Sequence, residues 1–226
     1  SDGGRRRCRG YRKEQGSAPI NEILAAGIIL LSGWKAETSF LDPMCGSGTI
    51  PIEAALIASD IPAGRFRQFY GFQRWRDYNE ELLLQVRKES ESEAHIPAIK
   101  ISGSDVSDDA VTMTHTNVES AGLSDIIKIS KNDFCDLKAS DNEGVIIMNP
   151  PYGQRIKSTD NDKLYSMIGS TLKHNFPGYQ AWLITSDKDS LKQVGLKPAK
   201  KTALFNGSLE CVLVKYELYQ GSKKNK

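Results

Sequence analysis

The chain has 226 residues, of which 39% are hydrophobic and 26% charged, and its formal net charge is +2. This length is enough for one α/β domain with a sizeable core, and the composition is ordinary for a globular protein. No apolar run reaches the ~20 residues needed to span a bilayer, because the longest, Ile23–Leu31, is short and interrupted by Gly27.

The two ends of the chain are basic. Residues 1–13 carry six Arg or Lys side chains against Asp2 alone, and the tail at 221–226 carries three lysines. Such a basic arm is typical of a segment that contacts a phosphate backbone, and it is equally typical of a solvated linker. Because the start at Ser1–Gly4 resembles a cut edge, we interpret residues 1–17 as the remnant of a link to an upstream domain. The domain itself is expected at 18–220, followed by the basic tail.

Helical and strand patterns alternate along the domain, with a Pro-, Gly-, Arg- and aromatic-rich insertion at 61–99 whose first part, 61–78, is expected to be an ordered loop. The turn signal Asn206–Gly207 lies between the last two strands. Alternation that closes in a hairpin predicts a doubly wound, mostly parallel sheet with an antiparallel last strand. The expected helices are 18–33, 47–58, 79–94, 108–121, 162–175 and 187–194, and the expected strands are 39–42, 100–104, 126–130, 145–149, 180–186, 200–205 and 210–218.

A Gly-rich turn follows the first predicted strand. In open α/β sheets ligands bind beyond the carboxyl ends of the strands, where Gly46 and Gly48 permit a close approach of the backbone. Asp42, at the strand end, is placed to accept a hydrogen bond from a cationic or amino group. The turn lacks the Lys of a P-loop and the third Gly of a dinucleotide fingerprint, so it suits a zwitterionic amino acid better than a pyrophosphate. A plain βα connection is the alternative, which the flanking Pro43 and Thr49 disfavour.

Acidic residues also follow the second and third strands. Asp105 is placed to accept both hydroxyls of a ribose. Its alternative role is to cap the next helix, which Ser107 or Asp108 can do instead. Asp133 and Phe134 could address the amino group and the face of an adenine, or could be a loop carboxylate and a core ring. The four cysteines lack metal-site or disulfide spacing, so we expect reduced thiols in the cytoplasm.

Asn149–Pro150–Pro151–Tyr152 ends a strongly hydrophobic strand. The exocyclic amine of a base is a poor nucleophile because its lone pair is conjugated into the ring. The side-chain carbonyl of Asn149 and the main-chain carbonyl of Pro150 can accept from that amine, while the prolines fix the backbone and Tyr152 stacks on the base. A proline-rich turn is the structural alternative. Together with the Gly-rich turn, the tetrad predicts an S-adenosylmethionine-dependent amino-methyltransferase.

These segments resemble those of a known family. Asp42–Thr49, with Glu53 one helical turn later, is similar to motif I of the class I RNA methyltransferases, and Asn149–Gly153 is similar to their motif IV. Arg9–Arg12 and Phe72–Trp75 resemble segments of the RlmL-like, THUMP-associated 23S rRNA guanine-N2 methyltransferases. The resemblance extends over nearly all of residues 9–219.

The resemblance implies a Rossmann-like, seven-stranded class I methyltransferase sheet, S-adenosylmethionine as methyl donor and no metal. It also implies the N2 amine of a guanine in 23S rRNA, free or in a precursor particle, as acceptor, and an upstream THUMP domain that binds RNA. The expected catalytic residues are Asn149, Pro150, Pro151 and Tyr152. The expected cofactor residues are Asp42, Pro43, Cys45, Gly46, Ser47, Gly48, Thr49, Glu53, Asp105, Val106, Asp133 and Phe134.

Three other functions share parts of this pattern. An adenine-N6 methyltransferase acting on DNA or RNA uses the same tetrad, but a DNA methylase needs a target-recognition domain, for which the chain has no room. A glutamine-N5 protein methyltransferase is also compatible, although the basic arm and the aromatic-rich insertion fit nucleic acid better. A non-catalytic RNA-binding module would be expected to have lost the tetrad or Asp42. The aromatic residues of the insertion are Phe66, Phe69, Tyr70, Phe72, Trp75 and Tyr78.

Overall fold

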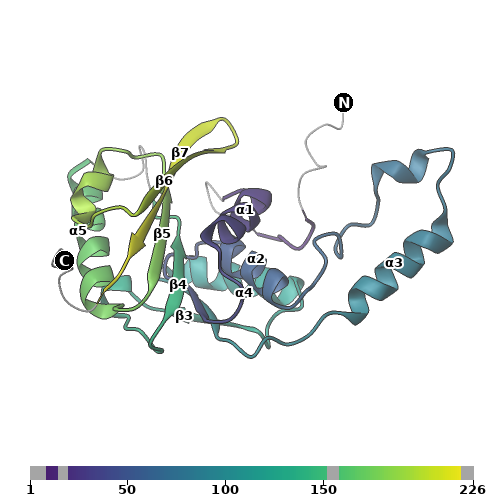
Figure 1. Ribbon diagram of the computed structural model, residues 1–226, viewed down its shortest axis with the longest axis horizontal. Coiled ribbons are helices and arrows are strands. Elements are labelled where there is room, and N and C mark those ends of the chain that lie inside the picture. Colours follow the sequence, from purple (N-terminus) through teal and green to yellow (C-terminus); the bar gives the residue numbers. More distant parts are fainter. Residues whose placement is uncertain (1–8, 15–19, 152–157, 220–226) are drawn as a thin grey trace.

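The computed structural model describes residues 9–14, 20–151 and 158–219. A seven-stranded sheet with the order β3-β2-β1-β4-β5-β7-β6 forms its centre, with helices against both faces (Figure 1). This arrangement confirms the predicted fold class. The strands are β1 (Ser39–Asp42), β2 (Ile101–Asp105), β3 (Ile127–Lys131), β4 (Gly144–Met148), β5 (Gln180–Thr185), β6 (Lys200–Asn206) and β7 (Leu209–Glu217).

Strands β1 to β5 are parallel, whereas β7 pairs antiparallel with both β5 and β6. The predicted turn at Asn206–Gly207 joins β6 to β7, and Gly207 adopts the left-handed φ of +66° that the turn requires. Because β6 runs in the direction of β5, this hairpin turn lies at the same edge as the carboxyl ends of the parallel strands.

The helices follow the predicted pattern with shifts at their ends. The first helix begins at Glu22 rather than at residue 18, because the side chain of Asn21 caps the backbone N–H groups of Ile23 and Leu24. The short helix predicted at 187–194 is a 3₁₀ turn. No helix in the described ranges is long and apolar enough to cross a membrane. The helices are α1 (Glu22–Ser32), α2 (Thr49–Ala58), α3 (Glu80–Ser92), α4 (Asp108–Ser120) and α5 (Ser158–Asn175), with 3₁₀ turns η2 (Gly71–Arg74), η3 (Phe134–Asp136) and η4 (Ser190–Val194).

The central strand β4 is buried on both faces. Val145 and Ile147 pack into the core formed with α1 and α2, whereas Ile146 and Met148 pack into the core formed with α5. This explains the continuous apolar run in the sequence, since a parallel strand covered on both faces has no polar side. Each such side chain contributes roughly 1.5–3 kcal/mol on burial.

The order of the strands reverses at β1, which lies between β2 and β4. Since these strands are parallel, the ends of β1, β2, β3 and β4 meet at one edge of the sheet. This is the switch point at which doubly wound sheets bind ligands. The sheet therefore brings the predicted motifs, which lie a hundred residues apart in the sequence, to one place.

The segment from Asp60 to Lys100 projects away from the sheet and carries η2 and α3 (Figure 1). None of its residues is buried. The loop expected at 61–78 contains the 3₁₀ turn η2, and the helix expected at 79–94 is α3. The insertion thus has ordered structure without a core of its own.

Candidate functional site

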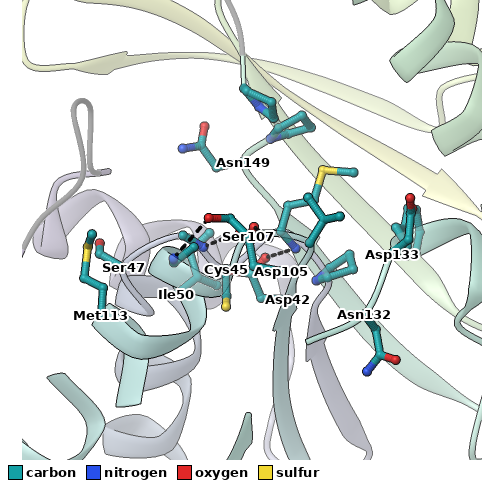
Figure 2. Close-up of a pocket in the computed structure, with 18 of the residues that line it drawn as sticks. Asp42, Cys45, Ser47, Ile50, Asp105, Ser107, Met113, Asn132, Asp133 and Asn149 are labelled. Atoms are coloured by element: carbon teal, nitrogen blue, oxygen red, sulfur yellow. Dashed lines mark hydrogen bonds between the residues drawn. The ribbon is translucent and has the colours of Figure 1, made fainter. Parts of the chain in front are cut away.

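A cavity of about 550 Å³ lies at the carboxyl ends of β1 to β4 (Figure 2). This volume is in the range of small-molecule and cofactor sites. The first three strands contribute one wall and the end of β4 the other. The predicted site residues on its wall are Asp42, Pro43, Cys45, Gly46, Ser47, Thr49, Asp105, Val106, Asp133, Phe134, Asn149, Pro150 and Pro151.

Two of the predicted site residues that the structure describes are not on this wall. Tyr152 lies outside the described residues. Gly48 does not line the cavity but shapes the turn that does, and Glu53 is one turn further along α2, directed elsewhere. The structure therefore does not bring Glu53 to the cavity.

The turn between β1 and α2 takes left-handed backbone angles at Gly46, with φ of +56°, and at Gly48, with φ of +79°. The hydroxyl of Thr114 on α4 donates to the carbonyl of Gly46 at 2.7 Å. Gly48 is the N-cap of α2, so no side chain caps the first turn of that helix. The positive end of the α2 dipole is consequently free to interact with an anionic group.

Asp42 ends β1 and is 1% exposed. The backbone N–H of Met44 donates to its Oδ1 at 3.2 Å. Burial is the main cause of a pKa well above the ordinary range, and the neighbouring Asp105 raises this pKa further. A buried carboxylate without a cationic partner among the described residues favours a ligand that supplies positive charge.

Asp105 ends β2 and ties two loops together. Its Oδ2 accepts from the backbone N–H of Gly46 and its Oδ1 from that of Ser107, each at 3.0 Å (Figure 2). The capping of α4 falls to Ser107, whose hydroxyl accepts from the N–H of Ala110. Asp105 is thus not the cap of α4, and its oxygens keep acceptor capacity toward the cavity.

Asp133 is the N-cap of η3 and Phe134 is its first residue, shortly after the end of β3. The carboxylate of Asp133 accepts from the N–H of Cys135 at 3.1 Å. The Phe134 ring is buried and stacks on Phe176 with a centroid distance of 5.7 Å. Both residues also line the cavity, so Phe134 combines a core position with a place on the cavity wall.

Asn149 follows β4, and Figure 2 shows its amide across the cavity from Asp42 and Asp105. This half-buried side chain makes no hydrogen bond with any described residue. Pro150 is buried behind it and Pro151 is exposed. The amide is therefore free to bind a ligand while the prolines restrict its backbone.

Glu53 anchors the described part of the N-terminal arm. The carboxylate is 1% exposed, accepts from the Tyr11 hydroxyl at 2.9 Å and pairs with the Arg9 guanidinium at 2.7 Å. Burial raises its pKa to about 7, although Arg9 acts in the opposite direction. Tyr11 is itself fully buried. Residues 9–14 therefore pack against α2.

Asn117 on α4 joins this arm to the Gly-rich turn. Its Oδ1 accepts from the N–H groups of Lys13 and Glu14 at 2.8 and 3.0 Å. Its Nδ2 donates to the carbonyls of Glu14 and Ser47 at 2.8 and 2.9 Å. Sequence reasoning missed this residue, although a polar residue beside Val118 on the buried face of a helix is a usable signal.

Replacing Asn117 by alanine is expected to lower the free energy of unfolding by about 2–4 kcal/mol, because it leaves buried backbone groups without partners. Urea titration of both proteins measures this difference. Glu119→Ala, at an exposed position of the same helix, is the matched control and should change stability by less than about 0.5 kcal/mol. Equal effects of the two variants would contradict the role assigned to Asn117.

The cavity also includes residues that the motifs did not identify. Ile50 and Met113 come from α2 and α4 and offer apolar surface, while Asn132 directly precedes Asp133 at the end of β3. The helix residues follow the strand motifs closely in the sequence, but nothing in their local pattern marks them as ligand contacts. The remaining additions are Ile20, Met44, Ser107, Asp109, Ala110, Leu164 and Met167.

Comparison with known proteins places this site in a family. The family described as RMKL-like, methyltransferase domain, matches residues 9–215. The ribosomal RNA large subunit methyltransferase K/L of Shewanella frigidimarina is 36% identical over 222 residues, which are 96% of this chain and 31% of that protein. The chain thus spans about a third of the length of such curated relatives.

Two solved structures are similar over most of this chain. SMU.472, a candidate methyltransferase complexed with SAH, has 37% identity and a TM-score of 0.87, covering 95% of this chain and 56% of that one. A predicted N6-adenine-specific DNA methylase from Listeria monocytogenes has 34% identity and a TM-score of 0.81, covering 93% and 54%. These likenesses agree with the sheet order described above. Because the family match covers nearly the whole chain, the chain belongs to the RMKL-like methyltransferase domains.

Proposed function

We propose that this chain transfers a methyl group from S-adenosylmethionine to the exocyclic N2 amine of a guanine in 23S rRNA. One observation carries the proposal: the amide of Asn149, which has no hydrogen-bond partner among the described residues, shares a cavity with the buried carboxylate of Asp42 and with the Gly-rich turn. One side of the cavity thus suits a cofactor and the other an amine.

The cofactor side fits S-adenosylmethionine in charge and shape. Its amino group would neutralise Asp42, and its carboxylate would lie near the uncapped start of α2. Asp105 would accept the ribose hydroxyls. Asp133 and Phe134 would contact the adenine, together with the apolar wall. Pro43, Cys45, Ser47, Thr49 and Val106 would complete this surface.

On the other side, two acceptors would orient the target amine. S-adenosylmethionine supplies an electrophilic methyl group when bound. The side-chain carbonyl of Asn149 and the main-chain carbonyl of Pro150 would accept from the two N–H groups, which directs the lone pair toward the donor. Pro150 and Pro151 would hold these acceptors in place, so the gain is one of preorganisation. Transfer of the methyl group would leave S-adenosylhomocysteine, and the positively charged N-methyl amine would release its extra proton to water, so no strongly basic side chain is needed. Tyr152 would stack on the base.

The names of the relatives support ribosomal RNA as the substrate class. The full protein is proposed to include an RNA-binding domain upstream, since the chain matches 31% of the Shewanella protein. In that arrangement residues 1–17 lead from the upstream domain into 18–220, of which 61–99 is the insertion, and 221–226 form a basic tail. The proposed setting is the cytoplasm, on 23S rRNA or a precursor particle.

Incubation with labelled S-adenosylmethionine and, in parallel, unmodified 23S rRNA, DNA and a release-factor-like protein tests the function. We expect N2-methylguanosine in the RNA. N6-methyladenine or methylated glutamine would replace the proposed acceptor with one of the alternatives that share the tetrad. Cofactor binding without transfer to any substrate would contradict the claim that this chain acts alone and favour a need for the upstream domain.

A further inference from the structure

The insertion exposes a group of aromatic and arginine side chains around η2. The segment from Asp60 to Lys100 buries none of its residues, so these side chains do not serve a core. Trp75 is 69% and Phe69 is 50% exposed. We call the group the aromatic–arginine surface, and it consists of Arg67, Phe69, Tyr70, Phe72, Arg74 and Trp75.

The rings and guanidinium groups of this surface are ordered against one another. Tyr70 and Phe72 stack with their centroids 5.1 Å apart and their planes at 21°. Arg67 lies over the Tyr70 ring at 5.6 Å, and Arg74 lies over the Phe69 ring at 5.2 Å. These contacts order the surface, and the rings of Phe69 and Trp75 remain exposed to solvent.

The charge of this surface has no counterpart nearby. Residues 61–78 contain four arginines and a single acidic residue, Asp77. None of these arginines forms an ion pair within 4 Å in the described part of the chain. Helix α3 is net acidic, because residues 80–93 carry five glutamates against Arg87 and Lys88, and of these two cations Arg87 lies over the Tyr70 ring at 5.4 Å. The basic half of the insertion therefore complements a polyanion, whereas the acidic half does not.

The insertion is also connected to the catalytic domain at a defined point. The Phe66 ring packs edge-on against Tyr11 with a centroid distance of 5.7 Å. Tyr11 in turn donates to Glu53 on α2, the helix that follows the Gly-rich turn. A ligand held by the aromatic–arginine surface is thus attached to the same rigid elements that form the cofactor side of the cavity.

We propose that the aromatic–arginine surface binds an unpaired segment of the RNA substrate, with bases stacked on its rings and phosphates on its arginines. Stacking on aromatic and guanidinium planes is how proteins hold single-stranded RNA, and paired bases cannot offer their faces in this way. The inference rests on the proposed function because it takes RNA as the substrate. It adds a binding site for the part of the RNA that lies outside the target nucleotide.

Tryptophan fluorescence provides a direct test. Of the three tryptophans in the chain, Trp34 and Trp182 are buried and Trp75 is exposed. Titration of the full chain with a protein-free single-stranded RNA of about 20 nucleotides, long enough for several stacked bases, is expected to quench Trp75. The duplex form of the same sequence should quench it less. Anisotropy of the labelled RNA gives the dissociation constant independently.

Trp75→Ala is expected to weaken binding of the single strand at least about five-fold, which is the lower range for one stacked base. Trp75→Phe should retain the affinity but abolish the quenching. For Arg74→Ala, the slope of log affinity against log salt concentration should become shallower by about one unit, which corresponds to the loss of one phosphate contact. Leu84→Ala, equally exposed but on α3, is the matched control and should bind normally.

Unchanged affinity of Trp75→Ala and Arg74→Ala, or no RNA binding by the unaltered chain, would overturn the proposal. The proposal would also be overturned if Leu84→Ala lost as much RNA affinity as Trp75→Ala, or if the surface bound a ribosomal protein and no RNA. These readouts do not require methyl transfer. If rRNA is methylated and the variants bind RNA normally, only this inference is contradicted. If RNA binding depends on Trp75 but no methylation occurs, only the proposed reaction is contradicted.

Discussion

Replacing Asn149 by alanine is expected to lower kcat for methyl transfer by about 10²–10³-fold, the range for removal of one preorganised polar group. The dissociation constant of S-adenosylmethionine should change by less than about two-fold, because the Asn149 amide lies across the cavity from Asp42 and Asp105. Transfer assays with saturating RNA and calorimetric titration of the cofactor measure the two quantities separately.

The fold should tolerate this replacement, since the Asn149 side chain makes no hydrogen bond with a described residue and is only half-buried. Asn149→Asp is the informative companion. It keeps an acceptor of the same shape and should therefore retain more activity than the alanine variant. Parallel loss of activity and cofactor affinity in Asn149→Ala would refute the assigned role in orienting the amine.

The fold could be predicted because its signals are local. Strands β4 and β5 are recognisable from their apolar sequences, and capping side chains mark the starts of α1, α3 and α4. The shifts concern the ends of elements, where a single side chain decides the boundary. Asn21 moves the start of α1, and η4 is too short to form an α-helix.

The site was predictable where a strand end determines the direction of a residue. Asp42 and Asp105 end parallel strands, and Asp133 and Asn149 closely follow two others, so the sheet brings them to one edge. Glu53 lies one turn inside α2, a helix buried on nearly all sides, and contacts Tyr11 and Arg9 instead of lining the cavity. Spacing alone cannot tell which neighbour such a residue meets.

Long-range hydrogen bonds were beyond prediction for the same reason. Asn117 bonds to Glu14 across 103 positions of sequence. No periodicity of α4 indicates that its buried amide would match a segment so far upstream. The position of residues 9–14 against the rest of the domain depends on such contacts.

Replacing Gly48 by alanine is expected to have the second large effect, on stability and cofactor binding together. A steric contact and an unfavourable backbone angle both contribute to the expected loss of stability. A Cβ at Gly48 would lie 2.7 Å from Cγ2 of Thr114, and the φ of +79° is unfavourable for any L residue. We expect a loss of about 2–4 kcal/mol in the free energy of unfolding. The cofactor should bind at least about ten-fold more weakly, because a displaced turn forfeits more than one hydrogen bond.

The chain contains a matched glycine that separates these two terms. Gly33 has nearly the same φ, +75°, at the end of α1, but a Cβ there would have no atom within 4 Å. Gly33→Ala should therefore cost only about 1 kcal/mol, the backbone term, and leave cofactor affinity unchanged. Thermal and urea unfolding of both variants give the difference, which is the steric cost at Gly48.

A second substitution, at Thr114, tests whether that steric contact causes the loss of stability in Gly48→Ala. Thr114→Ser removes the Cγ2 that a Cβ at Gly48 would meet, yet keeps the hydroxyl that donates to the carbonyl of Gly46. In the background of Gly48→Ala, this second change should recover stability and cofactor affinity in part. If Gly48→Ala were no more harmful than Gly33→Ala, or if Thr114→Ser gave no recovery, close packing of α4 would not be what requires glycine here. The left-handed φ at this position would then be the only reason that the turn requires glycine.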